Sequence, residues 1–524
     1  MNEIAETRAG RVAGVERGGI RIFRGIPFAR PPRGPLRWRP PEPPAPWSGV
    51  RPAVSTGPAA PQPAVANTAV GRLLPSAQAR SDEDCLTLNV WTPGLDGARR
   101  PVLVWIHGGA FVMGAGSSPL YSGRRLARRG DVVLVTINYR LGALGFLTLP
   151  GPAGERAALA GNCGIRDQLA ALAWVRENAA AFGGDPANVT IFGESAGAMS
   201  VGTLLGCPAG HGLFQRAILQ SGAAHNTSSA QQAARVAETF LAELGLTPDT
   251  AERLRDVPVD ALLAAQMRAS LALGLGHGTL PWQPAVDGEL LREPPLAEIG
   301  RGLAKDVPVI VGSNRDEWRL FLLGDRKGRR MDEAALGRRL ARALPGQGSD
   351  GATFAERALA HYRGDAGAAA APSALWAAFQ GDRIFAHPAA RLAELQSAHQ
   401  RDTYAYRFDF APFVMRRFVG ACHAAEIPLV FGTWRLPWLR PLYGGGPRLR
   451  RLARSMQRAW TEFARHGDPN HGAFPEWPAY DARRRTTMIL DGDCRAEEAP
   501  GEATRRFFAD LEEGVARGDA RRAS

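Results

Sequence analysis

The sequence predicts an α/β protein with one mostly parallel central sheet that helices flank on both faces. Short runs rich in β-branched and apolar residues indicate buried strands at 101–107, 132–139 and 189–193. Between the second and third of these runs, residues 167–181 carry apolar side chains at helical spacing. Strand, helix and strand in repetition is typical of a parallel sheet with helices on both faces.

Further strand patterns place the whole chain on the same sheet. They occur at 217–220, 307–312, 403–410 and 487–490. A length of 524 residues alone would suggest two or three domains, but one sheet spread over most of the chain predicts a single domain over 1–524. Segments at about 225–298 and 323–400 are rich in Ala, Leu and Arg with helical periodicity, and we expect them to be helical insertions that cap a substrate pocket.

A proline-rich run extends from Pro31 to Pro63. Its prolines argue against a helix or a central strand, because proline lacks a backbone N–H. We therefore expect this run to wrap over the surface as an extended arm.

The charge of +13 raises nucleic acid or an anionic membrane as a partner. Nearly all the basic residues are arginines dispersed along the chain, and short clusters such as 448–454 and 505–506 lack the aromatic interleaving of a nucleic-acid module. No stretch approaches the roughly 18 consecutive apolar residues of a membrane span, and residues 1–10 lack the apolar run of a signal peptide. These observations predict a cytoplasmic protein with no nucleic-acid and no membrane partner.

The five cysteines are scattered and show neither a CxxC pair nor metal-ligand spacing. We expect free thiols in a reducing compartment. They are Cys85, Cys163, Cys207, Cys422 and Cys494.

The strongest candidate for chemistry is the segment 193–197, Gly-Glu-Ser-Ala-Gly. It fits G-x-S-x-G and lies between a predicted strand and a helix start, which is the context of a nucleophile elbow. The residues that flank Ser195 must be small because the turn that exposes the hydroxyl is tight. Ser195 is therefore the candidate nucleophile.

A second glycine-containing segment, 105–111, reads Trp-Ile-His-Gly-Gly-Ala-Phe and follows a predicted strand. It is similar to loops that supply oxyanion-hole donors upstream of an elbow. The backbone N–H groups of Gly109 and Ala110, with that of Ala196 after the nucleophile, are the predicted donors. His107 is a rival candidate for the catalytic base, but its position favours a role in fixing this loop.

These motifs, with 83–90 (Glu-Asp-Cys-Leu-Thr-Leu-Asn-Val) and 182–186 (Phe-Gly-Gly-Asp-Pro), closely resemble the type B carboxylesterase and lipase family. That family includes the cholinesterases and bacterial para-nitrobenzyl-type esterases. The resemblance runs from Gly25-Ile26-Pro27 to Trp477-Pro478 and Tyr480. It implies the α/β-hydrolase fold.

The resemblance also implies the rest of the site. In the segment 312–317 it makes Glu317 the triad acid, with the adjacent Asp316 as the competing choice, and in 420–426 it makes His423 the general base. Glu194 and Ser221 match positions that support the histidine, although Ser221 is equally consistent with a packing residue. The pairs Arg37 with Glu83 and Arg140 with Asp167 match structural ion pairs of the family.

The sequence departs from the family at three places. No cysteine precedes Cys85, so the loop 53–82 is not closed by a disulfide, and this loop lacks the tryptophan that cradles choline in cholinesterases. Trp318 replaces the glycine that usually follows the acid, and we expect it to narrow the gorge or rotate the acid loop. Four aromatic residues are candidates for the pocket mouth, or else for packing: Phe111, Trp282, Trp318 and Phe321.

Together these observations predict a serine hydrolase that cleaves carboxylic esters of small molecules through an acyl-enzyme intermediate, with no metal and no organic cofactor. Activity is predicted to fall as the pH drops through the pKa of His423, about 6.5 if unperturbed. An amidase, carbamate hydrolase, lactonase or acyltransferase with the same triad, and a catalytically silent binding protein, stay open as alternatives. The sequence leaves the oligomeric state open between a monomer and a small homo-oligomer.

Overall fold

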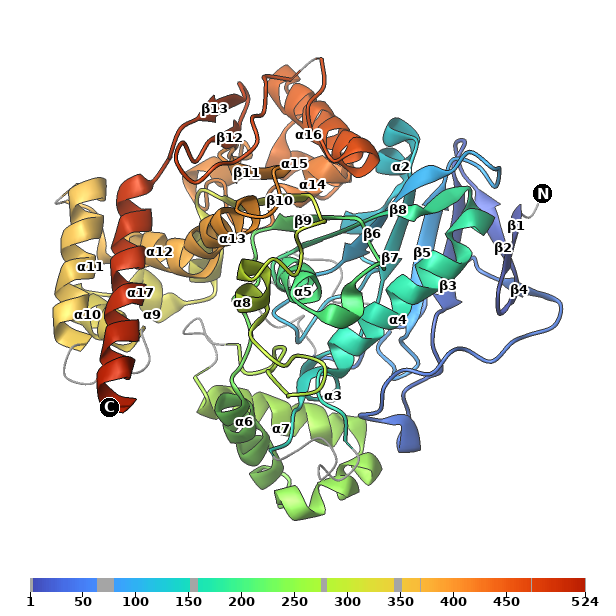
Figure 1. Ribbon diagram of the computed structural model, residues 1–524, viewed down its shortest axis with the longest axis horizontal. Coiled ribbons are helices and arrows are strands. Elements are labelled where there is room, and N and C mark those ends of the chain that lie inside the picture. The colour runs from blue at the N-terminus through green and yellow to red at the C-terminus, as the bar shows by residue number, and fades with distance from the viewer. Residues whose placement is uncertain are drawn as a thin grey trace.

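The central feature of the protein is a 13-stranded sheet (Figure 1). The structure is a computed structural model that describes residues 3–63, 80–150, 159–274, 280–343, 351–367, 369–472 and 474–523. The strand order of the sheet is β1-β2-β3-β5-β7-β6-β8-β9-β10-β11-β12-β13, with β4 beside β2. From β7 to β12 all neighbouring strands are parallel. The parallel strands are β7 (Val133–Ile137), β6 (Arg100–Ile106), β8 (Gly184–Glu194), β9 (Arg216–Gln220), β10 (Val309–Asn314), β11 (Thr403–Phe408) and β12 (Thr487–Leu490). The predicted α/β class is confirmed.

Every strand predicted from the sequence occurs; β12 has the predicted bounds, and the others have one or both ends shifted. The largest shift is in β8, which begins at Gly184 rather than at 189. The predicted helix at 167–181 is α4 (Cys163–Asn178), which begins four residues earlier and passes into the 3-10 turn η5 (Ala179–Phe182).

The sequence did not predict an antiparallel part of the sheet near the N-terminus. It consists of β1 (Glu3–Thr7), β2 (Gly10–Glu16), β3 (Arg21–Pro27) and β5 (Thr87–Thr92). The short strand β4 (Val50–Pro52) pairs parallel with β2. The first strands mix charged residues and glycine with few apolar ones, so the hydrophobic period is weak. At the other edge, β13 (Arg495–Glu497) pairs antiparallel with β12. The proline-rich run mostly lacks regular structure, and it contains one 3-10 turn, η1 (Gly34–Leu36), with Pro35 in its first turn, as well as the edge strand β4.

Alternate residues of the central strands fill two separate cores. Val104 and Ile106 of β6 face a core that includes α4 and α5 (Ala196–Leu205). Leu103 and Trp105 face the other core, with α2 (Arg124–Gly130), α14 (Ile427–Val430) and α16 (Pro447–His466). Because both faces are covered, the central strands are apolar throughout instead of alternating with polar residues.

The two segments predicted as insertions are largely helical. The first, 225–298, holds α6 (Ala230–Ala242), η7 (Pro248–Asp256), α7 (Val259–Ala272) and the start of α8 (Pro295–Gly300). The second, 323–400, holds α9 (Arg326–Arg329), α10 (Glu333–Arg342), α11 (Gly351–Ala366), α12 (Pro372–Gly381), the π-helical turn η11 (Asp382–Ala386) and α13 (His387–Ser397). Within the second segment, α13 packs against β10 and β11 and so belongs to the layer over the sheet.

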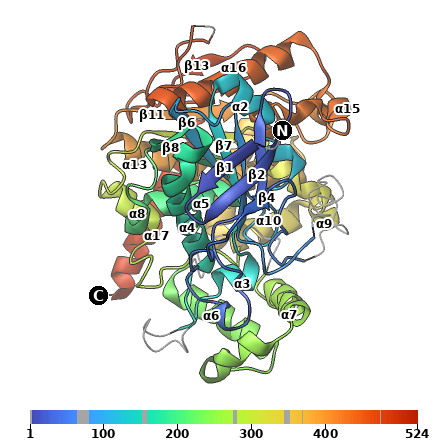
Figure 2. The same cartoon turned by 90° about the vertical axis from the view of Figure 1, so that its right-hand side faces the viewer.

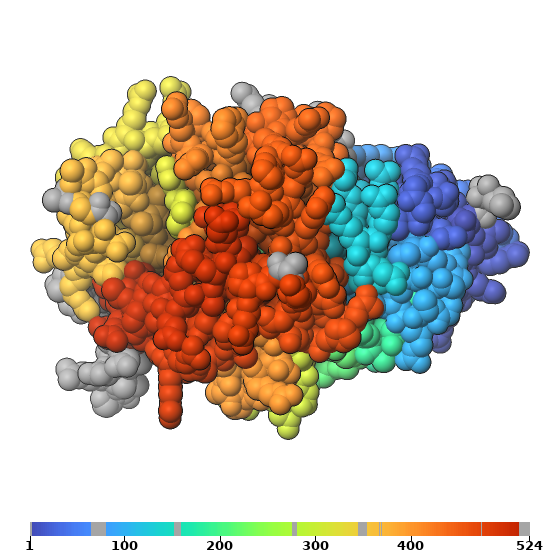
Figure 3. All heavy atoms as spheres, turned by 90° about the horizontal axis from the view of Figure 1, so that it is seen from above, coloured from blue at the N-terminus to red at the C-terminus, as the bar shows by residue number. Residues whose placement is uncertain are grey.

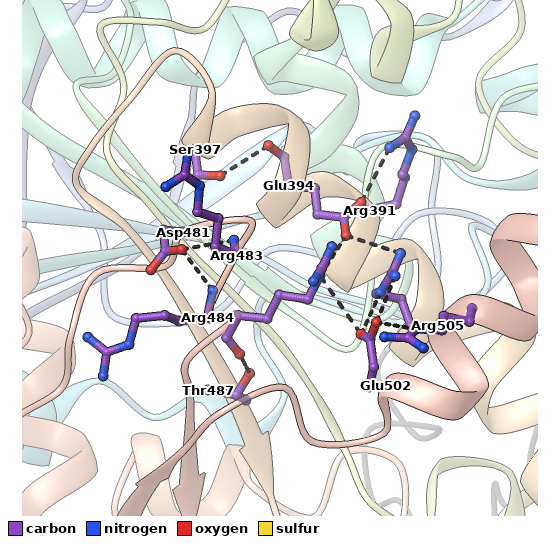
Figure 4. Close-up of polar contacts among 11 residues, drawn as sticks. Arg391, Glu394, Ser397, Asp481, Arg483, Arg484, Thr487, Glu502 and Arg505 are labelled. Atoms are coloured by element: carbon purple, nitrogen blue, oxygen red, sulfur yellow. Dashed lines mark hydrogen bonds and ion pairs between the residues drawn. The ribbon is translucent and has the colours of Figure 1, made fainter.

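The C-terminal helix α17 (Glu502–Ala523) packs Phe507, Phe508 and Leu511 into a third core formed by the second segment. An ion-pair network also holds its first turn (Figure 4). Glu394 of α13 lies 3.2 Å from Arg485 and 3.5 Å from Arg505, and Arg505 also pairs with Glu502 at 2.8 Å. The network therefore joins α13, the loop before β12 and α17.

Both ion pairs implied by the resemblance are present. Arg37 binds Glu83 through two hydrogen bonds of 2.6 and 2.8 Å, and Arg140 binds Asp167 through two of 2.8 and 2.6 Å. All four side chains are largely buried. In the described part of the chain, no helix is both long and apolar enough to cross a membrane.

Candidate active site

Ser195 occupies the turn between β8 and α5 and is half-buried among buried neighbours. Its backbone has φ 57° and ψ −128°, a conformation that costs energy for a residue with a side chain. A methyl group on Gly197 would lie 2.0 Å from the Ile106 carbonyl oxygen, and one on Gly193 would lie 2.5 Å from the Gly197 carbonyl carbon. The turn therefore requires glycine on both sides of the serine, which explains the motif found in the sequence.

The predicted oxyanion loop lies directly beside this turn. A methyl group on Gly108 would lie 3.0 Å from Cβ of Ser195, and Gly109 and Ala110 have φ of 117° and 54°. Within the described residues, the N–H groups of Gly109, Ala110 and Ala196 form no hydrogen bond, so all three are free to donate to a substrate oxygen.

His107 holds this loop and takes no part in a triad. Its ring stacks on Tyr139 at 4.5 Å, its Nδ1 lies 2.9 Å from the Gly108 carbonyl oxygen, and Tyr139 donates a hydrogen bond to the His107 carbonyl at 2.7 Å. Burial lowers its pKa to about 4. A neutral, stacked ring agrees with the role in fixing the loop that the sequence favours.

Glu317 and His423 come together although 106 residues separate them in the chain. Glu317 follows β10, and His423 lies between β11 and α14. Oε2 of Glu317 is 2.6 Å from Nδ1 of His423, and its Oε1 accepts a hydrogen bond of 2.7 Å from the Asn314 N–H. Both side chains are largely buried, so the carboxylate fixes the orientation of the imidazole.

The adjacent acid, Asp316, binds the backbone of the histidine loop instead. Its carboxylate accepts a hydrogen bond of 2.9 Å from the Ala421 N–H and pairs with Arg315 and Arg319 at 3.0 and 3.3 Å. Of the two candidate acids, the structure therefore places Glu317 at the imidazole.

Comparison with known proteins decides the family. The sequence profile described as "Carboxylesterase family" matches residues 1–508. The chain belongs to the carboxylesterase family. It is 38% identical over 509 residues to a para-nitrobenzyl esterase of Bacillus subtilis (strain 168), which covers 96% of this chain and 98% of that protein. A phenmedipham hydrolase of Pseudarthrobacter oxydans is 35% identical over 500 residues, covering 95% and 96%.

Solved structures agree with the sequence comparison. A carboxylesterase of Geobacillus stearothermophilus has a TM-score of 0.84 at 41% identity and covers 96% of this chain and 99% of its own. The family, the α/β-hydrolase fold and the reaction class expected from the sequence are thus confirmed: the protein is a serine hydrolase that cleaves ester bonds of small molecules.

The second nitrogen of His423 faces a second carboxylate in this carboxylesterase. Nε2 lies 3.1 Å from Oε1 of Glu194, the residue before the nucleophile. In the described parts of the chain, neither the Ser195 hydroxyl nor Oε1 of Glu194 forms a hydrogen bond, so Nε2 lies close to Glu194 without being bonded to either side chain. Triad geometry in enzymes without substrate is often incomplete in this way.

Opposing effects set the pKa of the imidazole. Burial lowers the pKa of His423, but the carboxylates of Glu194 and Glu317 outweigh burial and raise it to about 9. Burial raises the pKa of Glu194 to about 8, against the lowering effect of His423. The pKa of His423 therefore lies above the value of about 6.5 for an unperturbed imidazole, because two carboxylates lie beside the ring.

A third carboxylate, Glu426, anchors the histidine loop to the sheet. It accepts hydrogen bonds from the side chains of Asn314 at 2.6 Å and Gln220 at 3.0 Å. Ser221, the other predicted supporting residue, is fully buried with φ 51°, and its hydroxyl has no hydrogen-bond partner within the described chain. A supporting role for Ser221 therefore stays a prediction.

Two aromatic rings pack against His423. The ring centroids of Phe385 and Phe321 lie 4.7 and 5.1 Å from that of His423. Phe321 was a candidate from the sequence, whereas Phe385 comes from η11, where no motif marks it.

The other aromatic candidates divide between the site and the core. Trp318 packs against Phe321 at 4.6 Å and leaves Glu317 in contact with His423, so it does not turn the acid away. Phe111 and Trp282 are fully buried against Phe146 and Phe240, which makes them packing residues.

Proposed function

We propose that this carboxylesterase uses Ser195 as nucleophile, His423 as general base and Glu317 to hold the imidazole. The observation that carries the proposal is the 2.6 Å contact between Glu317 and Nδ1 of His423, beside a strained turn that exposes Ser195. Ser195, Glu317 and His423 follow the carboxyl ends of the parallel strands β8, β10 and β11, at the edge where open α/β sheets bind their ligands.

The reaction proceeds in two halves. Oγ of Ser195 bonds to the ester carbonyl carbon while its proton passes to Nε2 of His423; the C–O bond to the alcohol then breaks, and that proton leaves with the alcohol. In the second half, water gives a proton to His423 and attacks the acyl-enzyme, and the acid leaves as Ser195 recovers its proton.

Two sets of groups support these steps in the proposal. The N–H groups of Gly109, Ala110 and Ala196 donate to the oxyanion, and one such donor is worth roughly 10²–10³ in rate. Glu194 and Ser221 support the histidine. Glu194 lies 3.1 Å from Nε2 and attracts the protonated imidazole, and in the reaction Nε2 turns to the Ser195 hydroxyl.

We also propose that residues 1–524 form one domain in which the helices of 225–298 and 323–400 cap the pocket. The half-buried Trp318 and Phe321, just before the second segment, support an apolar wall beside His423. No contact in the site favours an amide, carbamate, lactone or acyl-transfer reaction over ester hydrolysis.

We further propose a cytoplasmic location. All five cysteines are free thiols, four of them buried, and this is typical of proteins that fold in a reducing compartment. Cell fractionation with a disulfide-sensitive shift assay tests this; recovery outside the cytoplasm would contradict it.

Hydrolysis of p-nitrophenyl esters from acetate to dodecanoate tests the central proposal. We expect turnover in the unmodified protein and in the matched control Ser397→Ala, whose serine lies on α13. Ser195→Ala should lose at least about 10³ in kcat. Equal rates in Ser195→Ala would remove Ser195 from the mechanism, and no turnover of any ester by the unmodified protein would contradict the proposed substrate class.

A further inference from the structure

One face of the molecule carries a cluster of arginines without acidic partners. The cluster, called here the arginine face, comes from α2, α16 and the 3-10 turn η13 (Thr433–Arg435). Within the described residues, none of its members has a carboxylate within ion-pair distance. It consists of Arg124, Arg125, Arg128, Arg129, Arg435, Arg450 and Arg454.

These guanidinium groups are close enough to repel one another. Burial and the charges of Arg435, Arg124 and Arg128 lower the pKa of Arg125. Burial and the charges of Arg435 and Arg454, among others, lower that of Arg129. The elements therefore bring their positive charges to one place.

Nearby carboxylates pair with other arginines. Asp131 lies 2.6 Å from Arg100, and Glu462 lies 3.8 Å from Arg458. Asp493 lies 3.4 and 3.9 Å from Arg448 and Arg451, at the beginning of α16. The arginine face is thus left with an excess of positive charge.

An exposed apolar loop borders this face. Phe413 and Phe418 are 77% and 70% exposed and Val414 is 44% exposed, although these residue types are usually buried. Arg416 and Arg417 lie between the two phenylalanines and are also exposed, with no carboxylate partner in the described chain. Several apolar side chains with charged neighbours in one surface loop are typical of an interaction site.

One hydrogen bond and packing contacts through α15 connect the loop 413–418 to the arginine face. The Val414 N–H donates to the Leu442 carbonyl of α15 (Arg440–Tyr443) at 3.2 Å. The helix α15 in turn contacts η13. Gly432, the residue before η13, is close to α2: a methyl group on it would lie 3.0 Å from Cδ of Arg125. Figures 1 and 2 place α2, α15 and α16 along the same side, and Figure 3 views that side from above, with the orange surface beside the cyan one.

We propose that the arginine face and the loop 413–418 form a peripheral docking surface for an anionic lipid membrane. The arginines would attract acidic headgroups, and Phe413, Val414 and Phe418 would enter the interface between headgroups and acyl chains. Stable attachment to a membrane needs two such signals together, and both are present here. A nucleic-acid partner would account for the arginines but not for the exposed Val414 and phenylalanines.

Docking would act on the enzyme through the loop itself. Phe418 is five residues before His423 in the sequence, and the Tyr443 hydroxyl of α15 binds the Ala425 carbonyl at 2.8 Å. The surface would thus hold the histidine loop close to lipid that contains dissolved esters. Membrane binding itself does not depend on the proposed catalytic roles, so it is measured without ester hydrolysis.

Vesicle flotation tests the proposal with the full chain. We expect the protein to float with vesicles of phosphatidylcholine and phosphatidylglycerol at least about tenfold more than with phosphatidylcholine alone, and less at high salt. Arg124→Gln/Arg128→Gln/Arg450→Gln/Arg454→Gln should reduce partitioning by roughly 600-fold, because each of the four arginines contributes roughly fivefold. Phe413→Ser/Phe418→Ser should reduce it at least about tenfold.

Matched controls carry the same changes on other surfaces. Arg253→Gln/Arg292→Gln/Arg330→Gln/Arg338→Gln removes four exposed arginines elsewhere, and Met267→Ser/Leu271→Ser removes the exposed apolar residues of α7. Both should bind vesicles like the unmodified protein. Solution turnover of a short p-nitrophenyl ester confirms that each variant is folded.

Three results would overturn the proposal. These are equal binding to neutral and anionic vesicles, an equal loss of binding in the controls, and no vesicle binding at all. Retention of labelled duplex DNA without vesicle binding would assign the arginines to nucleic acid instead.

Discussion

Nε2 of His423 lies 3.1 Å from the carboxylate of Glu194, while Nδ1 of the same ring lies 2.6 Å from Glu317. The imidazole is therefore held between two buried carboxylates. Because the base must be neutral to take the serine proton, the same contacts that position the ring also oppose its deprotonation. This arrangement makes the pH dependence of the enzyme informative.

The pH profile of kcat/KM should fall on its acidic side at a pH above 6.5. The raised pKa of His423, about 9, means that activity is present above this pKa and is lost as the pH falls through it. Glu194→Gln removes one carboxylate and should move this limb to lower pH, with Glu194 and His423 titrating as a coupled pair in the unmodified protein. An exposed control, Glu252→Gln, should leave it in place. If the acidic side of the profile stayed in place or moved to higher pH in Glu194→Gln, Glu194 would not be the carboxylate that raises the pKa of His423.

Substituting Glu317 and Asp316 one at a time distinguishes the acid that orients His423 from the acid that stabilises the histidine loop. Glu317→Gln should lower kcat by about 10²–10⁴, because an amide no longer favours the useful tautomer of His423. Asp316→Asn removes a partner of Ala421 and two arginines, so it should lower the melting temperature with a much smaller effect on kcat. Steady-state kinetics and thermal unfolding of both variants check this. The reverse pattern would make Asp316 the triad acid.

Gly197→Ala should destabilise the protein by at least about 3 kcal/mol, since its methyl group would lie 2.0 Å from a backbone oxygen that has little freedom to move. Gly337→Ala is the matched control. This glycine lies inside α10 with open space around it, and alanine there should stabilise by up to about 1 kcal/mol. Denaturant unfolding measures both. A stable, active Gly197→Ala would show that the turn is looser than described.

The ion-pair network of α17 predicts a local effect. Glu394→Gln leaves Arg485 and Arg505 with one carboxylate between them and should cost about 1 kcal/mol of stability. Glu498→Gln breaks an exposed pair with Arg484 and should have no measurable effect. Hydrogen exchange should show the loss around α17. Identical unfolding curves for both variants would assign no stability to the network.

The sequence predicted the parallel strands well because they are continuous apolar runs bounded by breaks. It could not predict β1 to β3, whose stability comes from pairing along the sheet rather than from their own pattern. The C-terminal helix was missed for a similar reason: Phe507 and Phe508 are buried by a segment more than a hundred residues earlier in the chain.

The candidate site was likewise predictable from the sequence only in part. Local turn geometry demands Gly193 and Gly197, so Ser195 could be found by pattern alone. Glu317 and His423 meet across 106 residues, and only the resemblance to a family named them. The resemblance also indicated Glu194 as a neighbour of His423, whereas the contact with Phe385 carries no sequence signal, because it depends on how η11 and the histidine loop pack together. The carboxylates of Glu194 and Glu317 raise the pKa of His423, and the contact with Glu317 orients its ring.

The most direct test of the mechanism is covalent labelling with an organophosphate ester, followed by peptide mass spectrometry. The account predicts one adduct per chain, on the peptide that contains Ser195, with loss of p-nitrophenyl ester turnover in proportion to labelling. Ser195→Ala should be neither labelled nor active. An adduct on another residue, or turnover that survives complete labelling of Ser195, would contradict it.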